Sequence, residues 1–474
     1  MKNRNSSLIK NFSYSFVGNL LTMFVSALGS LIIPKFIGVE DYGYWQLFLF
    51  YSSYLSFAQF GWSDGIYLRF GGEKIENLDK VVFKGQSILF SIFQFIITLI
   101  LIVYANLVIT NENYANIANL LALSLFIGNL LNLTRIIFEA VANFKASSFS
   151  IMIDRLLYLF LIIVLILSGN VSSKLIIIAD LIGKITALLI TLYYFKPMLI
   201  SKSPNFGESI IEAKKNIKVG INLMLSNISN MLIIGIPRFG IEKFWSITTF
   251  AKISLILNLS NLITKFVNTI GLVLFPYLKN TGHTKQTFIY TILRSAYTYG
   301  VLMLFLFFYP LKELMMWWLP EYSESLEYMS ILFPISLFQG KMALLITPFI
   351  KALRKEKQML KINIITLVLS FILAMVTILV ARNLYLAITS IVISLAFRSY
   401  IAENLLSQTL KFHYWKHRLL EGVVIISFSL LGLYSSTLTA MLLYTLVLSI
   451  YLFINRKDFF NLFYYIKKAV QTYK

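Results

Sequence analysis

The sequence predicts an all-α membrane protein that crosses the bilayer about fourteen times. Of its 474 residues, 58% are hydrophobic and 13% are charged, so the charged share is roughly half that of an average soluble domain. Apolar runs of roughly 20 residues, long enough to span a bilayer as helices, fill almost the whole chain. A short stretch also occurs twice in altered form, which is typical of a transporter built from two copies of one helix bundle.

The repeated stretch runs from Ile33 to Tyr42 and recurs from Ile236 to Phe244. Ile33-Pro34-Lys35-Phe36 aligns with Ile236-Pro237-Arg238-Phe239. Six predicted helices separate the two copies, so both copies enter the membrane from the same side. We therefore predict two six-helix lobes related by a pseudo-two-fold axis along the membrane normal. The alternative is that two unrelated helix ends share a proline and a basic residue.

Hydrophobic periodicity and length place the individual spans. They cover residues 11–37, 44–65, 81–106, 115–138, 150–168, 174–196, 217–237, 244–275, 288–310, 327–350, 362–381, 384–406, 419–435 and 437–455. We expect an N-terminal lobe over residues 1–196, a cytoplasmic linker over 197–216 and a C-terminal lobe over 217–406. Residues 407–474 would add two further helices and a basic amphipathic tail that lies in the membrane interface.

The basic residues predict the orientation of the chain. If the connections alternate between two sides, most Lys and Arg residues fall on the side of the N-terminus, so both termini should be cytoplasmic. The net charge of +21 is spread along the chain and forms no basic patch with interleaved aromatics, which argues against nucleic acid as a partner. The chain has no cysteine and three scattered histidines, and no catalytic, cofactor or metal-binding motif is present, so we expect neither an enzyme nor a cofactor.

Polar residues inside the predicted spans are the candidate site residues, because a charge in hydrocarbon costs at least about 2.5 kcal/mol. In the span 244–275 they recur at helical spacing and share one face. These residues are Ser254, Asn258, Asn261, Lys265 and Asn268. Asn19 and Asn222 occupy equivalent positions in the two repeats. We interpret these faces as walls of one cavity between the lobes; the alternative is helix packing through small polar groups.

Two further cations favour an anion site in that cavity. Lys341 has no acid in its own span, although an acid on another helix could pair with it, and Arg398 shares a face with Ser390 and Ser394.

Three weaker candidates have local alternatives. Arg135 could pair with Glu139, Lys184 with Asp180 and Asp64 with Arg69.

Three motifs carry a resemblance to a known family. They are Asn11-Phe12-Ser13-Tyr14, the stretch Phe36-Ile37-Gly38-Val39-Glu40-Asp41-Tyr42-Gly43, and Phe60-Gly61-Trp62-Ser63-Asp64-Gly65 followed by Arg69. The chain resembles the polysaccharide biosynthesis proteins, or O-antigen and capsule flippases, of the superfamily that also holds multidrug exporters and peptidoglycan lipid flippases. One departure concerns residues 233–235, where many relatives place an acid and this chain has Ile-Ile-Gly.

The resemblance implies a flippase of the bacterial inner membrane. It would move an undecaprenyl-diphosphate-linked oligosaccharide across the bilayer by alternating access, for assembly of O-antigen, capsule or exopolysaccharide. Its partners would be that substrate, the lipid bilayer and other polysaccharide assembly proteins. The alternatives are a cation-coupled multidrug-type exporter, which predicts an acidic cavity, a membrane glycosyl or acyl transferase, and a non-catalytic scaffold.

Overall fold

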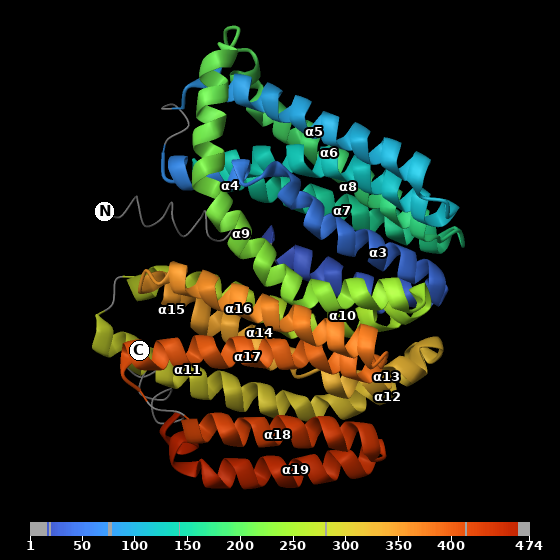
Figure 1. Ribbon diagram of the computed structural model, residues 1–474, viewed down its shortest axis with the longest axis vertical. Coiled ribbons are helices and arrows are strands. Elements are labelled where there is room, and N and C mark those ends of the chain that lie inside the picture. Colours follow the sequence, from blue (N-terminus) through green and yellow to red (C-terminus); the bar gives the residue numbers. More distant parts are fainter. Residues whose placement is uncertain are drawn as a thin grey trace. The chain divides into compact units, whose positions relative to one another are not determined.

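The computed structural model describes residues 17–18, 20–73, 78–141, 143–279, 282–412 and 415–462. Within these ranges every regular element is a helix (Figure 1). Eleven of these helices are long and apolar enough to cross a membrane, and a twelfth span results if the bent pair Pro320–Leu332 and Ile335–Ala352 is counted as one. The prediction of an all-α polytopic membrane protein is confirmed. The two remaining predicted spans, 11–37 and 44–65, correspond to a shorter apolar helix, Leu20–Phe36, and to a broken segment.

The chain divides into two compact units, an N-terminal unit of residues 1–228 and a C-terminal unit of residues 229–474. The boundary falls inside one continuous helix, α9, which has 39 residues. The predicted linker 197–216 is therefore helical from Phe206 onward. The repeat relation between residues 1–196 and 217–406 stays a prediction.

The N-terminal unit contains the helices up to the first part of α9. They are α2 (Ile33–Phe36), α3 (Val39–Leu55), the 3₁₀ helix η1 (Ser56–Gln59), α4 (Trp62–Phe70), α5 (Lys80–Val108), α6 (Glu112–Ala140), α7 (Phe144–Leu167), α8 (Ser173–Leu199) and α9 (Phe206–Phe244). Polar side chains begin several of them. Asp79 caps α5, Asn111 caps α6 and Ser172 caps α8, each accepting hydrogen bonds from backbone N–H groups of the first turn.

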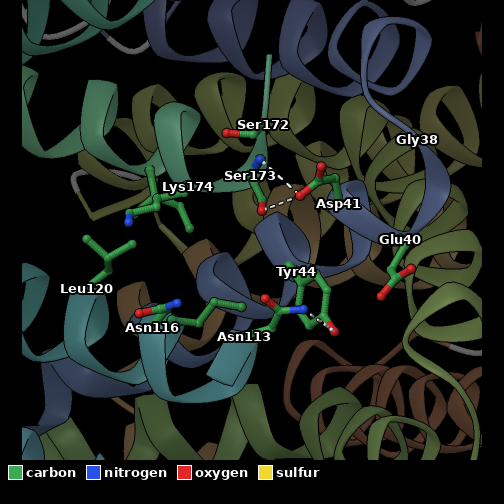
Figure 2. A pocket seen from close by; sticks show the side chains of 12 residues that line it. Gly38, Glu40, Asp41, Tyr44, Asn113, Asn116, Leu120, Ser172, Ser173 and Lys174 are labelled. Carbon is green, nitrogen blue, oxygen red and sulfur yellow. Dashed lines mark hydrogen bonds between the residues drawn. The ribbon is translucent and has the colours of Figure 1, made fainter. Parts of the chain in front are cut away.

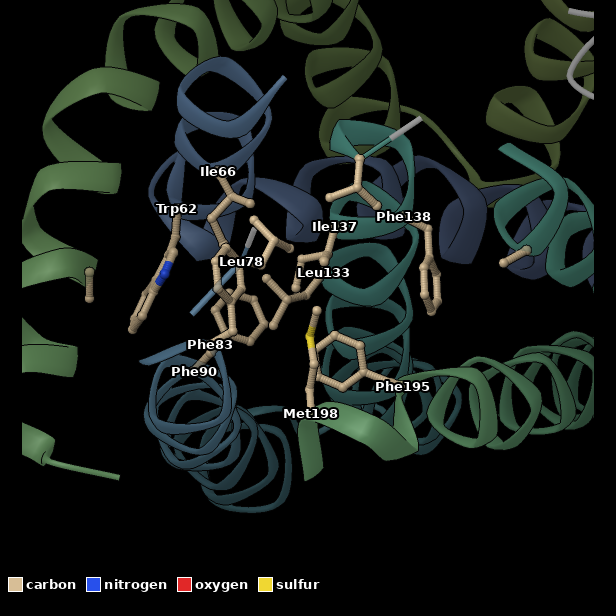
Figure 3. Close-up of a cluster of buried hydrophobic side chains, with 13 residues drawn as sticks. Trp62, Ile66, Leu78, Phe83, Phe90, Leu133, Ile137, Phe138, Phe195 and Met198 are labelled. Carbon is tan, nitrogen blue, oxygen red and sulfur yellow. The ribbon is translucent and has the colours of Figure 1, made fainter. Parts of the chain in front are cut away.

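An aromatic core joins the helices of the N-terminal unit (Figure 3). Phe83 and Phe90 lie two helical turns apart on one face of α5, and Leu133 and Ile137 lie one turn apart on α6. Trp62 of α4 packs edge-to-face on Phe90 with ring centroids 5.4 Å apart. This core fixes the positions of the helices that carry the buried charges described below.

The second predicted span, 44–65, is not one helix, which corrects the sequence-based expectation. α3 ends at Leu55, and after η1 the chain turns through two left-handed residues, Phe60 (φ 52°) and Gly61 (φ 75°), before α4 begins. Hydrophobicity continues across this break, so periodicity alone does not reveal it. Glycine adopts the left-handed conformation without a steric penalty.

Two glycines also allow α4 and α9 to approach closely. A Cβ atom on Gly65 would overlap the backbone of Asn216, and one on Gly220 would overlap the backbone of Gly61. We predict that Gly65→Ala lowers the free energy of unfolding by about 1–3 kcal/mol, because the backbone atoms of Asn216 cannot move aside as a flexible side chain would. Unfolding of the purified protein by SDS titration measures the loss. Gly300→Ala is the matched control, since no atom lies within 4 Å of its added Cβ; equal stabilities for the two variants would contradict the prediction.

The C-terminal unit contains the remaining helices. They are α10 (Ile247–Lys279), α11 (His283–Leu304), η3 (Phe305–Phe307), α12 (Phe308–Trp318), η4 (Pro320–Tyr322), α13 (Ser323–Leu332), α14 (Ile335–Gly340), the π-helical turn η5 (Lys341–Ile346), α15 (Thr347–Ala352), α16 (Glu356–Ala374), the π-helical turn η6 (Met375–Val380), α17 (Leu384–Leu410), α18 (Trp415–Tyr434) and α19 (Thr437–Ile454).

The C-terminal unit has one bent span and two added helices at its C-terminal end. The predicted span 327–350 bends by 47° between α13 and α14, where Pro334 lacks the N–H group that a continuous helix needs. The last two helices, α18 and α19, are packed onto the unit: Ser429 donates a hydrogen bond to the Ser330 carbonyl (3.1 Å) and Tyr444 donates one to the Leu302 carbonyl (2.9 Å). Part of the expected tail, residues 463–474, lies outside the described residues.

Candidate functional site

Among the described residues, each unit contains a cluster of buried and half-buried charges on its membrane-spanning helices. In the N-terminal unit the members come from α6, α7 and α8, and we call them the N-cluster. They are Arg135, Asp154, Arg155, Asp180 and Lys184. Three basic side chains face two acidic ones, so the N-cluster has a formal charge of +1.

Asp154 is the hub of the N-cluster. Its carboxylate lies 3.2 Å from a guanidinium nitrogen of Arg135 and 2.9 Å from one of Arg155, and the residue is 2% exposed. Arg155 reaches on to Asp180 at 3.2 Å, and Asp180 pairs with Lys184 at 2.6 Å. The charges therefore form one continuous chain across three helices, in which each acid bridges two bases.

The structure decides between the alternatives for Arg135 and Lys184. Lys184 does pair with Asp180 one turn away. Arg135 forms its ion pair with Asp154 rather than with Glu139, whose carboxylate accepts a hydrogen bond from the Ser147 hydroxyl (2.7 Å).

A polar cavity of about 240 Å³ opens beside the N-cluster. Arg135, Asp154, Arg155 and Lys184 line it together with hydroxyl and amide groups. These neutral polar residues are Ser52, Ser56, Ser124, Asn129 and Asn132. The cavity thus combines cations with neutral hydrogen-bonding groups, as a site for an anionic or strongly polar group requires.

The C-terminal unit holds the second cluster, which we call the C-cluster. Its members come from α11, η5, α17 and α18, and they are Arg294, Lys341, Glu403, Arg418 and Glu421. Three bases again face two acids.

The ion pairs of the C-cluster connect α18 to the rest of the unit. Glu421 of α18 pairs with Lys341 and lies 2.7 Å from Arg294. Glu403 of α17 pairs with Arg294, and its second oxygen lies 3.4 Å from Arg418. Lys341, Glu403, Arg418 and Glu421 also line one part of an otherwise mostly apolar groove of about 630 Å³ between α14, α17 and α18.

Lys341 is 4% exposed and is balanced by acids from other helices. The structure thus supports the alternative given above, in which an acid on another helix pairs with Lys341. Lys341 also begins the π-helical turn η5. Such turns are rare in proteins overall, and those that occur often lie at functional sites.

Arg398 has a different environment. It is 7% exposed, and its Nε donates a hydrogen bond to the Asn363 side-chain oxygen of α16 at 2.9 Å. No carboxylate of the described residues forms an ion pair with it. Ser390 and Ser394, on the same face of α17, are buried as well.

The polar stripe predicted for residues 244–275 lies on α10. Along it Ser254 is buried and accepts a hydrogen bond from Arg238 (2.9 Å), Asn258 and Asn261 are half-buried, and Lys265 and Asn268 are exposed. Lys252, on another face of α10, pairs with Glu324 at 2.8 Å.

The remaining candidates are placed as follows. Asn222 is exposed on α9, and Asn19 lies outside the described residues. Asp64 does not pair with Arg69, which instead binds Glu212 (2.7 Å) and the Asn216 side-chain oxygen (2.6 Å) of α9.

Sequence reasoning missed six members of the two clusters. They are Asp154, Arg155, Arg294, Glu403, Arg418 and Glu421. Five of them lie inside predicted spans, so a charge within an apolar run was the available signal. Within the described part of the chain, no group of His, Asp and Glu residues is arranged to hold a metal ion.

Comparison with solved structures places the fold among membrane transporters. The protein titled "Lipid II flippase MurJ, inward closed conformation" has a TM-score of 0.67 and 14% identity, covering 95% of this chain and 100% of that one. An inward-facing multidrug resistance MATE family transporter of the MOP superfamily has a TM-score of 0.57 and 14% identity over 82% and 95% of the two chains. A Vibrio cholerae MATE transporter, VcmN, has a TM-score of 0.56 and 16% identity, covering 85% of this chain and 97% of that one. At these identities the likeness shows the fold.

The family follows from the sequence itself. Residues 8–281 match the family model described as "Polysaccharide biosynthesis protein", and the chain belongs to this family. No sequence among the curated proteins matches significantly.

Proposed function

We propose that this protein is a flippase for an undecaprenyl-diphosphate-linked oligosaccharide. It moves its substrate across the bacterial inner membrane by alternating access, with both termini in the cytoplasm, and supplies the assembly of O-antigen, capsule or exopolysaccharide. The substrate would have three parts with different needs: an apolar polyprenyl chain, a diphosphate and a polar oligosaccharide.

The observation that carries the proposal is the excess of bases over acids within the two charge clusters. Both clusters contain three bases and two acids, and Arg398 adds a buried guanidinium held by a neutral amide. A diphosphate that passes through the membrane needs cations at intermediate depth, because an isolated anion is costly in hydrocarbon. Lys265, Lys341 and Arg398, with Asn258, Asn261, Asn268, Asn19 and Asn222 as polar lining, are the proposed site residues.

The alternative is a cation-coupled exporter of small molecules, since multidrug transporters share the fold. Such an exporter of cationic compounds requires acidic side chains that are available to its substrate. In both clusters of this chain every acid is already paired with more than one base. The charge balance therefore favours an anionic substrate.

We predict that Lys265→Gln slows polysaccharide export by about tenfold or more. Glutamine keeps a hydrogen-bonding group of similar length but removes the charge, and a hydrogen bond to a charged group is worth about 1.5–3 kcal/mol, where about 1.4 kcal/mol corresponds to tenfold in rate. The measurement is surface polysaccharide per cell after the gene is deleted and replaced by the variant. Lys341 is less suitable for this test, because its substitution would also leave Glu421 short of a partner.

Lys252→Gln is the matched control, because Lys252 lies on another face of the same helix and pairs with an exposed glutamate. It should export at the level of the unaltered protein. If Lys265→Gln, at equal protein abundance, also exported at that level, Lys265 would not be part of the site.

A further inference from the structure

A second polar pocket lies at one end of the N-terminal unit and shares no lining residue with the cavity beside the N-cluster. Three connections meet there: the turn from α2 to α3, the start of α6, and the start of α8 (Figure 2). The cavity measures about 450 Å³, within the range of small-molecule sites. We call this cavity the turn pocket. It is lined by Gly38, Glu40, Asp41, Tyr44, Asn113, Asn116, Ile117, Leu120, Ser172, Ser173, Lys174 and Ile177.

The turn pocket contains part of the stretch that occurs twice in the sequence. Gly38, Glu40 and Asp41 belong to the stretch Ile33 to Tyr42. Gly38 precedes α3, and the two acids lie in its first turn, where they favour the positive end of the helix dipole. That position explains why an acid can be there, but it does not explain a pocket lined with amides, hydroxyls and a lysine.

Hydrogen bonds between elements hold the walls of the turn pocket in place. The Asp41 carboxylate accepts from the hydroxyl (2.5 Å) and the backbone N–H (3.3 Å) of Ser173, which links α3 to α8. The Asn113 amide donates to the Tyr44 hydroxyl (3.3 Å), which links α6 to α3, and Figure 2 shows both contacts. Tyr44 is 8% exposed and packs edge-to-face on Tyr114. Hydrogen bonds within the protein therefore connect α3, α6 and α8 around the pocket.

Three side chains of the turn pocket remain available for a ligand. Within the described residues, no hydrogen bond or ion pair engages the side chains of Glu40, Asn116 and Lys174. They offer a carboxylate acceptor, an amide that both donates and accepts, and an ammonium donor. Ile117, Leu120 and Ile177 supply apolar surface beside them.

The mixture of groups narrows the chemistry of the ligand. Two carboxylates and one ammonium give a formal charge of −1, which disfavours a phosphate or other anion. Lys174 in turn disfavours a dedicated cation site. Carboxylates, amides and hydroxyls around a partly apolar wall fit a neutral, polyhydroxylated molecule, whose hydroxyl groups each donate and accept and whose C–H faces are apolar.

We propose that the turn pocket binds the sugar portion of the transported lipid-linked oligosaccharide. This inference rests on the proposed function and on the predicted orientation, which places the α2–α3 turn and the α5–α6 and α7–α8 connections on the outer side. There the pocket holds the oligosaccharide after it has crossed. Glu40 and Asn116 provide the main hydrogen bonds to hydroxyl groups.

Saturation-transfer difference NMR on the full-length protein in nanodiscs tests this proposal. The probe is the lipid-free repeat-unit oligosaccharide, released by mild acid hydrolysis from the surface polysaccharide of the same strain. The unaltered protein should transfer saturation to the sugar protons, and the double variant Glu40→Gln/Asn116→Ala should weaken binding by about tenfold or more, because two of the ligand's polar partners are lost.

Asn119→Ala is the matched control. Asn119 lies one turn after Asn116 on α6 and forms a hydrogen-bonded pair with Asn106 outside the turn pocket. It should bind the probe as the unaltered protein does. The proposal is overturned if the unaltered protein gives no saturation transfer, or if the double variant binds the probe as well as Asn119→Ala does.

The two proposals fail in different ways. If the gene deletion abolishes surface polysaccharide but the probe does not bind, the turn-pocket inference alone is wrong. If deletion leaves the surface polysaccharide unchanged, the proposed function is wrong, whatever the probe does.

Discussion

Replacing Glu421 with alanine should lower the free energy of unfolding by about 3–5 kcal/mol, the usual cost of breaking a buried ion pair by removing one partner. Glu421 is buried on α18 and pairs with Lys341 and Arg294. Without it, three buried bases would share the single carboxylate of Glu403. SDS titration of the purified protein measures the change, and tryptophan fluorescence follows the unfolding.

A second acid on the same unit provides the control. Glu324 pairs with Lys252 at 2.8 Å, but its side chain is 83% exposed, so Glu324→Ala should leave the stability nearly unchanged. A double variant, Lys341→Leu with Glu421→Leu, should recover part of the stability, because it removes both charges of one pair together. Equal losses for Glu421→Ala and Glu324→Ala would show that the C-cluster does not hold α18 in place.

Replacing Asp154 with alanine should have an effect of similar size, about 3–5 kcal/mol. Asp154 bridges Arg135 and Arg155, and Asp180 would be left as the only acid of the N-cluster. The two guanidiniums would then lie close together beside a small polar cavity with no carboxylate between them. The same SDS titration measures the loss.

A double-mutant cycle with Arg135→Met identifies the origin of that loss. If Asp154 acts through Arg135, the double variant should be more stable than the sum of the single losses predicts, by about 0.5–3 kcal/mol. Asp79→Ala serves as a reference for an acid that acts only as a helix cap, with an expected loss of about 1 kcal/mol. Strict additivity of Asp154→Ala and Arg135→Met would contradict the bridging role.

Much of the fold could be predicted from the sequence, because long apolar runs in a membrane protein have few structural options. Five predicted spans each correspond to one helix of the structure, namely α5, α6, α7, α8 and α17. The breaks were harder to predict. Phe60 and Gly61 interrupt a run whose hydrophobicity continues, and the bend at Pro334 has a sequence signal that the hydrophobic pattern concealed.

The charge clusters could be predicted only in part. Lys184 and Asp180 lie one turn apart on the same helix, so their ion pair was among the alternatives. Lys341 pairs instead with Glu421, 80 residues further along the chain. A single sequence contains no information on which helices are neighbours, and therefore it cannot reveal such partners. The turn pocket was missed for the same reason, since three separate connections form it.

Transbilayer movement of a lipid-linked oligosaccharide tests the central claim most directly. The purified full-length protein would be reconstituted into liposomes that contain a fluorescently labelled undecaprenyl-diphosphate oligosaccharide, and a membrane-impermeant quencher would report the fraction in the outer leaflet over time. The proposed function predicts that the protein accelerates exchange between leaflets and that Lys265→Gln slows this exchange about tenfold relative to Lys252→Gln. Exchange no faster than in protein-free liposomes, from a preparation shown to be folded, would contradict it.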